Sequence, residues 1–460
     1  MVSDKNELLR NLPSVDDLTE TISGLPEADG FSRKYVTAVC RDELDTIRKL
    51  ILDGKQGVND IHDVVTDRIK TALVDLKTPA LKRVVNLTGV FVHTNLGRSP
   101  LPQDALDALI TAGDYCNLEY DLSERKRGKR DRNLFRMLNL ITGCDHFLLV
   151  NNNAAALFLM LNTFAKGKQV AVSRGELIEI GGSFRIPDIM RSAGAKLVEV
   201  GTTNRTRISD YEKAADDGAM MFLKVHTSNY KVGGFTESVK TGELVELAKK
   251  REILCFEDIG SGSFVNLEEI GIPYEPTVQD SLKEGVDLVS FSVDKLLGGP
   301  QGGLVLGKRD LIDKMNKNPI KRVVRAGKLT LLALEATLRM YLDQDNFLRK
   351  HPLYRNFFVD NEALQKRGSD LIRKLNIKLG DNVSYKVRPD KCYLGGGSLP
   401  EQAIDTIVLE ITPLKIKLKK LADLFFDNNP PIIGRTSNDC LIFDLRQLEN
   451  VDDAVPSGSL

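Results

Sequence analysis

From about residue 82 onward, short apolar runs alternate with longer stretches of helical periodicity. Polar or glycine-rich turns separate these runs, which fall at residues 147–150, 169–172, 196–200, 220–225, 253–256, 286–291 and 303–306. Strands that alternate with helices form a largely parallel sheet covered on both faces, and ligands bind at the carboxyl ends of its strands. We therefore predict an α/β fold whose functional residues lie just after these runs.

The regions on either side have different patterns. Residues 1–80 carry apolar residues at three- and four-residue spacing, which predicts a small helical domain that ends in a linking helix. A helical stretch at 329–348 precedes a mixture of helices and strands, such as the strand expected at 406–411. We expect three domains: 1–80, a catalytic domain at 81–328, and a smaller α+β domain at 329–460.

Composition excludes several classes of protein. Lys+Arg and Asp+Glu both number 64, so no overall positive field draws the chain toward nucleic acid. The six cysteines include no C-x-x-C pair, so we expect neither a metal site nor a disulfide framework. The first residues are charged, and no run of about 18 apolar residues occurs. These features are typical of a cytoplasmic protein.

Lys295 stands in a turn just after one of the apolar runs. Ser292 and Asp294 share this turn, and Gly298 and Gly299 follow it. Pyridoxal phosphate (PLP) chemistry needs such a lysine to carry the aldehyde, an acid beside the pyridine nitrogen and an anion cradle for the phosphate. We predict that Lys295 holds PLP as a Schiff base; the alternative is an ordinary surface lysine.

The residues that follow two other apolar runs, 253–256 and 147–150, provide candidates for the acid and for the phosphate cradle. Asp258 closely follows the apolar run 253–256 and precedes a Gly/Ser turn, so its carboxylate is well placed to bond the pyridinium nitrogen of PLP. The alternative is an ordinary aspartate at the end of a strand. Asn152, Asn153 and Ala154 begin a helix directly after a run, where free N–H groups can bind the phosphate; asparagine capping is the alternative. The order of cradle, acid and lysine resembles the aspartate-aminotransferase-like PLP enzymes of fold type I.

Longer motifs narrow this resemblance. They are residues 86–98, 173–185, 199–205, 224–229, 257–263 and 294–301. These segments resemble the signature blocks of bacterial selenocysteine synthases, the L-seryl-tRNA(Sec) selenium transferases, and the resemblance runs from about residue 8 to 446. It implies that serine on tRNA(Sec) is converted to selenocysteine with selenophosphate through an aminoacrylyl intermediate. Lys295 would remove the Cα proton, and a homodecamer would be the assembly.

The resemblance also implies roles for individual residues. Arg98, Arg322 and Arg325 would form the selenophosphate pocket, although the last two also suit a solvated basic face. Asp294 would orient Lys295 or assist proton transfer, with a turn cap as the alternative. The remaining active-site positions implied are Thr202, Thr203, Asn229 and His226. His226 would stack on the PLP ring, unless it is a core histidine.

The helical segment that the family uses to bind tRNA is acidic here. Residues 1–80 contain 11 Lys and Arg against 15 Asp and Glu, a formal charge of −4. Phosphate binding needs cations, so we expect tRNA to contact a one-sided basic face or to be recognised by shape. The candidate face consists of Arg33, Lys34, Arg41, Arg48 and Lys49. The charge-dense loop 124–132 is a further phosphate contact, or else only a solvated loop.

Position 293 departs from the family, which usually has glycine there. Val293 lies two residues before Lys295, and its branched side chain either narrows the pocket or faces the core.

Two rival functions remain. A PLP lyase or transaminase acting on a free amino acid would need an arginine for the substrate carboxylate, and Arg435 is the candidate. A non-catalytic relative would keep the fold and bind tRNA without turnover.

Overall fold

The computed structural model describes residues 8–54, 61–180, 184–227, 232–395 and 403–459. Contacts between Cα atoms divide the chain into two compact units that meet at Arg83 and Val84, and each is considered by itself. Within the described ranges, no helix has both the length and the apolar character needed to span a bilayer.

The first unit is helical and has its own core. It contains α2 (Val15–Ser23), α3 (Arg33–Leu52) and α4 (Ile61–Lys77). Along α3 the buried residues recur every three or four positions; they are Val36, Cys40, Leu44, Ile47 and Ile51. This spacing places them on one side of the helix, where they pack with the buried face of α4.

A seven-stranded sheet forms the centre of the second unit. Its order is β4-β12-β11-β10-β9-β5-β8. The strands are β4 (His146–Val150), β5 (Gln169–Ser173), β8 (Lys196–Val200), β9 (Met221–Val225), β10 (Leu254–Gly260), β11 (Leu288–Ser292) and β12 (Gly303–Gly307). All seven predicted apolar runs thus form one sheet. Only β12 runs antiparallel to its two neighbours, which confirms the α/β class and a largely parallel sheet.

Each face of this sheet has its own hydrophobic core. Phe147 and Leu149 of β4 belong to one cluster and Leu148 to the other, because successive side chains of a strand point to opposite faces. Helices α7 (Asn153–Phe164), α8 (Ile186–Ser192) and α12 (Arg309–Lys317) contribute to the second cluster. Helices α6 (Arg132–Thr142), α10 (Thr241–Lys250) and α11 (Val278–Glu284) contribute to the first. Helices therefore cover both faces of the sheet.

The single helix predicted at 329–348 is instead two helices. Helix α14 (Lys328–Met340) ends before Tyr341, and α15 (Gln344–Lys350) begins after Asp343. The side chain of Asp343 accepts hydrogen bonds from Asn346 at 2.9 Å and from Lys350 at 2.6 Å. Asp343 is the N-cap residue of α15 but, among the described residues, makes no side-chain hydrogen bond to the helix backbone; its carboxylate lies at the helix N-terminus, where negative charge is favourable.

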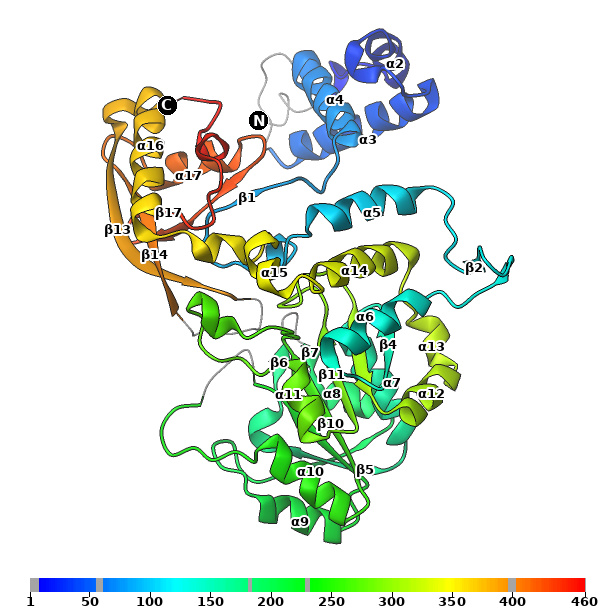
Figure 1. The fold of residues 1–460 in the computed structure, drawn as a ribbon. Helices are drawn as coiled ribbons and strands as arrows, with labels where there is room; N and C mark the ends of the chain where they lie inside the picture. Colours follow the sequence, from blue (N-terminus) through cyan, green and yellow to red (C-terminus); the bar gives the residue numbers. More distant parts are fainter. Residues whose placement is uncertain (1–7, 55–60, 181–183, 228–231, 396–402, 460) are drawn as a thin grey trace. The chain divides into compact units, whose positions relative to one another are not determined.

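The last part of the chain contains a second, antiparallel sheet of order β13-β14-β17-β16 (Figure 1). Its strands are β13 (Val383–Tyr393), β14 (Ala403–Pro413), β16 (Arg435–Ser437) and β17 (Cys440–Asp444). Helices α16 (Asn361–Leu379) and α17 (Leu418–Phe426) pack on it. A short strand near the start of this unit, β1 (Val85–Asn86), pairs with β15 (Ile432–Ile433). The segment after β1 is thereby tied to the C-terminal region.

Val293 faces the core. Its side chain is 0% exposed and belongs to the hydrophobic cluster on one face of the sheet. A Cβ placed on Gly299 would lie 2.7 Å from Val293 Cγ1, and one on Gly302 would lie 3.4 Å from Cγ2. The valine methyl groups thus fill space that these two glycines leave open, so the second of the two alternatives for position 293 is correct.

Truncating this side chain should lower stability. We expect Val293→Ala to reduce the free energy of unfolding by about 1–3 kcal/mol, because it removes two buried methyl groups and leaves a cavity. Urea denaturation of the full chain measures the change. The matched control is Val323→Ala, at a side chain that is 81% exposed, where a change within about 0.5 kcal/mol is expected. Equal effects of the two substitutions would contradict the packing described for Val293.

Candidate active site

Lys295 is buried in a tight turn that follows β11. Its residue is 5% exposed, which rules out the alternative of a surface lysine. The turn is held on two sides: the Val293 N–H donates to the Gly302 carbonyl at 2.9 Å, and the Leu296 N–H donates to the Ser261 carbonyl at 3.1 Å. The lysine therefore leaves the carboxyl end of a central strand, between two glycine-containing segments.

Four charged groups surround the Lys295 amine. Burial lowers the pKa of Lys295, and the nearby guanidinium of Arg98 lowers it further. The carboxylates of Asp258, Asp294 and Glu275 act in the opposite direction. Because burial outweighs the acids, the amine loses its proton more readily than an ordinary lysine does.

Asp258 lies on β10, the strand next to β11. Its Oδ1 atom accepts hydrogen bonds from Asn153 Nδ2 at 2.8 Å and from the Gly260 N–H at 3.1 Å. Burial raises the pKa of Asp258, while Asn153 and Lys295 oppose that rise. A buried carboxylate in this position is stabilised by a cation, and a protonated pyridine nitrogen would be one.

The start of α7 connects the acid to the expected phosphate cradle. Asn152 caps the helix, since its side chain accepts a hydrogen bond from the Ala155 N–H at 2.8 Å. Capping is thus the observed role of this side chain, whereas Asn153 reaches across to Asp258. Ala154 lies in the first turn of α7, where backbone N–H groups have no partner within the helix. The helix start therefore offers an anion site.

Arg98 and Asp294 form an ion pair beside Lys295. Arg98 Nη1 lies 3.0 Å from Oδ1 and 2.9 Å from Oδ2 of Asp294. The side chain of Arg98 is 30% exposed and Asp294 is buried. Arg98 adopts a left-handed φ of 65°, a conformation that non-glycine residues rarely adopt and that is often found at functional sites. Asp294 is therefore more than a turn cap.

Arg322 and Arg325 lie in a different charged group. Arg325 Nη1 is 3.7 Å from Glu119 Oε1, and Arg130 pairs with the same oxygen at 2.9 Å. Arg322 is exposed. The backbone of Arg325 bridges to Val150, the last residue of β4, three positions before the start of α7. Among the described residues, no hydrogen bond or ion pair joins these two arginines to the Arg98–Asp294 pair.

Two of the other four polar positions line a neighbouring cavity of about 400 Å³. Thr203 and His226 line it, whereas the Thr202 hydroxyl donates to the Arg205 carbonyl at 3.0 Å. The His226 N–H donates to the Asp258 carbonyl at 2.8 Å, and His226 Nε2 lies 3.2 Å from Glu275 Oε1. Asn229 lies outside the described residues.

Several buried polar atoms near Lys295 are unsatisfied, and they test whether PLP fits. Asn153 Oδ1, Ser99 Oγ and Ser261 Oγ are buried without a hydrogen-bond partner among the described residues. Buried polar atoms normally have partners, so this cluster matches a site that receives a polar ligand. Together with Asp258 and the start of α7, it meets the requirements for a ring nitrogen and a phosphate.

Sequence reasoning missed two buried charged features. Glu275 is 2% exposed and interacts with both His226 and Lys295. Lys224 Nζ donates to Glu176 Oε1 at 3.2 Å, and both residues line the cavity that contains His226. Glu275 stands between two prolines in an irregular segment, where no periodicity indicates burial. Lys224 begins the family motif 224–229, but as a polar residue between Leu223 and Val225 it gave no sign of an ion pair with Glu176.

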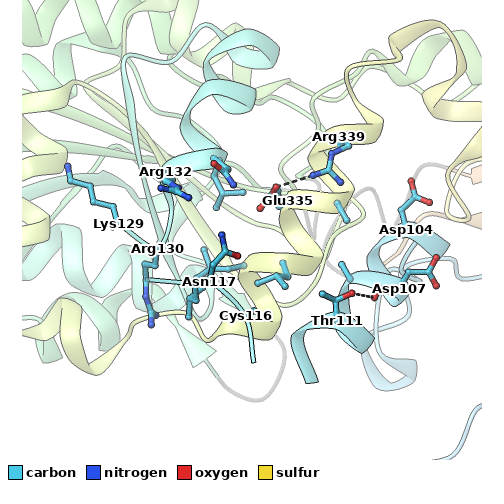
Figure 2. A pocket seen from close by; sticks show the side chains of 17 residues that line it. Asp104, Asp107, Thr111, Cys116, Asn117, Lys129, Arg130, Arg132, Glu335 and Arg339 are labelled. Carbon is cyan, nitrogen blue, oxygen red and sulfur yellow. Dashed lines mark hydrogen bonds and ion pairs between the residues drawn. The ribbon is translucent and has the colours of Figure 1, made fainter. Parts of the chain in front are cut away.

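A second hollow of about 420 Å³ contains none of the predicted catalytic residues (Figure 2). It lies between α5 (Gln103–Gly113), α14 and the segment before α6. Asp104 and Asp107 line one side, and Lys129, Arg130 and Arg132 line the other. The basic residues belong to or adjoin the charge-dense loop 124–132, so that loop is partly anchored to the body of the second unit.

Known proteins share both the sequence and the fold. Residues 84–449 match the L-seryl-tRNA selenium transferase family. The L-seryl-tRNA(Sec) selenium transferase of Carboxydothermus hydrogenoformans is 43% identical over 97% of this chain and 96% of its own length. The enzyme of the same name from Clostridium botulinum strain Okra has the same identity and coverage.

A solved structure, that of a D-glucosaminate-6-phosphate ammonia-lyase, covers 83% of this chain and 95% of its own, with a TM-score of 0.57 and 15% identity. This likeness concerns the fold alone, which is fold type I of the PLP enzymes. PLP is the cofactor of the family. The match over residues 84–449 and the 43% identity over nearly the whole length show that the chain belongs to the L-seryl-tRNA selenium transferase family.

Proposed function

We propose that this protein converts L-seryl-tRNA(Sec) to L-selenocysteinyl-tRNA(Sec), with PLP as cofactor and selenophosphate as selenium donor. One observation carries the proposal. Lys295 is buried beside Asp258 and Asp294 at the carboxyl ends of central strands, in a chain that is 43% identical to enzymes of that name.

The residues around Lys295 suit PLP. Lys295 would form the covalent link, Asp258 would face the ring nitrogen, and His226 would stack on the ring. The phosphate would be bound by the start of α7 and by the end of β11, through Asn152, Asn153, Ala154 and Ser292. Bound PLP would withdraw electrons from the serine Cα, which makes the Cα proton acidic and lets hydroxide leave from Cβ.

Lys295 would act as the base that removes the Cα proton. Its lowered pKa supports this role, because a general base must lose its own proton near neutral pH. Asp294 would orient the amine, and Arg98 holds the Asp294 carboxylate in turn. Thr202, Thr203 and Asn229 would line the site that receives the serine.

Arg98, Arg322 and Arg325 would bind selenophosphate, because guanidinium groups match a tetrahedral oxyanion. In one chain Arg98 pairs with Asp294 while Arg325 lies beside Glu119. We therefore propose that subunit packing brings the two groups to one anion, in the homodecamer that the family resemblance implies.

Transfer RNA would bind the first 80 residues. Lys34, Arg41 and Arg48 are exposed and seven residues apart on α3, so they form one stripe despite the acidic composition of the unit. The loop 124–132, which contains the hairpin strand β3 (Lys126–Arg127), would add phosphate contacts. Residues 81–328 would then form the catalytic domain and 329–460 the C-terminal domain.

The rival of a free amino acid substrate is less well supported. Arg435 is the candidate for binding a free carboxylate, but its Nη1 donates to the Thr88 carbonyl at 2.8 Å and its Nη2 to Asp390 at 2.9 Å. In an aminoacyl-tRNA the carboxylate is an ester and carries no charge. Such a substrate needs no free arginine, and Arg435 is already hydrogen-bonded within the protein. The six free cysteines suit the reducing cytoplasm, where we place the reaction.

Lys295→Ala should abolish both the colour and the reaction. The purified protein is expected to be yellow, and the variant should lose this visible absorption because no amine remains to bind the aldehyde. Absorption spectra and identification of the amino acid on tRNA(Sec) after incubation with selenophosphate measure the two effects. Lys308→Ala, which removes the partner of Asp287 instead, should keep both. A variant at 295 that stays coloured would show that the lysine is wrong.

Arg98→Lys should weaken binding of the selenium donor. We expect KM for selenophosphate to rise at least about tenfold, because an ammonium keeps the charge but lacks the guanidinium fork. Steady-state kinetics at saturating seryl-tRNA measure it, with Arg339→Lys at an exposed ion pair on α14 as control. If kcat falls while KM is unchanged, Arg98 acts only through Asp294 and does not bind the donor.

Removal of residues 1–80 should separate tRNA binding from cofactor binding. The first unit has its own core and the second has its own, so the shortened protein should still bind PLP. Filter binding with seryl-tRNA(Sec) should show a loss of at least about a hundredfold in affinity, which corresponds to several lost phosphate contacts. Unchanged affinity in a correctly folded truncation would contradict this domain assignment.

A further inference from the structure

Three consecutive backbone carbonyls directly after Lys295 each accept a hydrogen bond from a buried aromatic side chain. The pairs are Leu296 with the Tyr354 hydroxyl, Leu297 with the Tyr341 hydroxyl at 2.8 Å, and Gly298 with His351 Nε2 at 3.0 Å. We call these three side chains the carbonyl clamp. None of them was among the predicted site residues, and each is at most 1% exposed.

The tautomer of His351 is fixed by its surroundings. The Leu353 N–H donates to His351 Nδ1 at 3.1 Å, so Nδ1 is the acceptor and Nε2 carries the proton that is donated to Gly298. Burial lowers the pKa of His351 to about 4. The ring is therefore neutral near neutral pH and donates to a single carbonyl.

The shape of the lysine turn is matched to this ring. Gly298 has a left-handed φ of 77°, and a Cβ at this position would lie 2.3 Å from His351 Cε1. Only glycine allows both the backbone conformation and the approach of the ring. The imidazole thus packs directly against the backbone three residues beyond Lys295.

The three rings of the clamp pack around a fourth ring, that of Phe347. Phe347 stacks on Tyr341 with ring centroids 3.8 Å apart, and its ring lies 5.2 Å from that of His351 and 5.9 Å from that of Tyr354. Tyr341 directly follows α14, whereas Phe347 belongs to α15 and His351 directly follows it. The four rings are therefore buried against one another, and close packing opposes the displacement of any one of them.

The donor groups of the same turn are also engaged. The Leu296 N–H bonds to Ser261, and the Gly298 N–H bonds to the Lys295 carbonyl at 3.0 Å. A buried tyrosine hydroxyl needs some acceptor wherever it lies, so one such bond would indicate packing alone. Three donors that converge on three successive carbonyls beside a buried lysine instead fix the backbone from which the lysine side chain starts.

We propose that Tyr341, His351 and Tyr354 are positioning residues, which hold the Lys295 backbone so that its amine meets the cofactor aldehyde and the substrate Cα in reactive geometry. The inference rests on the proposed role of Lys295. The clamp acts through the backbone and touches neither cofactor nor substrate, and a displacement of about 1 Å at a reacting group can cost up to a hundredfold in rate.

Substitutions that remove or replace the donors of the clamp test it in the full-length protein. The variants are Tyr341→Phe with Tyr354→Phe, His351→Leu, and His351→Gln, whose amide can both donate to Gly298 and accept from Leu353. The first readout is the rate at which protein stripped of PLP regains visible absorption when PLP is added. The second is kcat and KM for seryl-tRNA per coloured site. The third is the pH at which that absorption changes.

We expect the double tyrosine variant and His351→Leu to regain PLP about tenfold more slowly and to lose about tenfold in kcat, with KM for seryl-tRNA unchanged. The pH of the spectral change should shift as the Lys295 amine leaves its place between the acids. His351→Gln should retain most of the wild-type behaviour, since it restores both hydrogen bonds.

Tyr211→Phe is the matched control, because Tyr211 is 1% exposed and its oxygen accepts from the Ser173 N–H at 3.1 Å. It should lower Tm without changing PLP uptake. If the clamp variants also lower Tm but keep wild-type uptake, kcat and spectral titration, the clamp only stabilises the fold and the inference is wrong. Lys295→Ala that stays coloured would instead overturn the role of the lysine.

Discussion

The burial of one lysine among opposing charges is the constraint on which the second unit of this protein depends. A buried ammonium is costly unless it is paired. Asp258 and Asp294 supply that pairing, yet burial raises the pKa of both acids and lowers the pKa of Lys295. Arg98 offsets part of the negative charge by bonding Asp294. The charges of these four side chains therefore offset one another only while all four keep their positions, which requires a well-packed backbone around them.

This backbone consists of strand ends and the loops that join them. Asp258 lies near the carboxyl end of one central strand and Lys295 follows the neighbouring strand, so the parallel register of β10 and β11 sets their separation. The antiparallel strand β12 returns directly beside β11, and the close approach of Gly303 to the Asn152 carbonyl brings the start of α7 to the same edge. The acid, the lysine and the helix N-terminus thus meet because of sheet topology rather than local sequence.

The strands of the central sheet and the positions of Asp258 and Lys295 could be predicted from the sequence, because local patterns indicate them. Apolar runs of four to six residues marked all seven strands, and Asp258 and Lys295 stood at their ends. What escaped prediction depends on long-range contacts. The residues of the carbonyl clamp lie about 50 positions from the turn that they hold, and the break at Asp343 appears only as a turn inside an otherwise helical pattern. The edge strand β13 contains Pro389, which is tolerated at an edge but hides the strand pattern.

The hydrogen bonds that Arg435 already makes indicate which class of substrate the site suits. A free amino acid brings a carboxylate that an uncommitted guanidinium would bind. Arg435 is committed to Asp390 and to the backbone of Thr88, and Gly89 leaves room for its head group, since a Cβ there would lie 2.5 Å from Nη1. Freeing this arginine would remove one of the hydrogen bonds that tie the segment around Thr88 to the C-terminal sheet. The arginine thus supports the fold of the active-site segment, and a substrate whose carboxylate is esterified makes no demand on it.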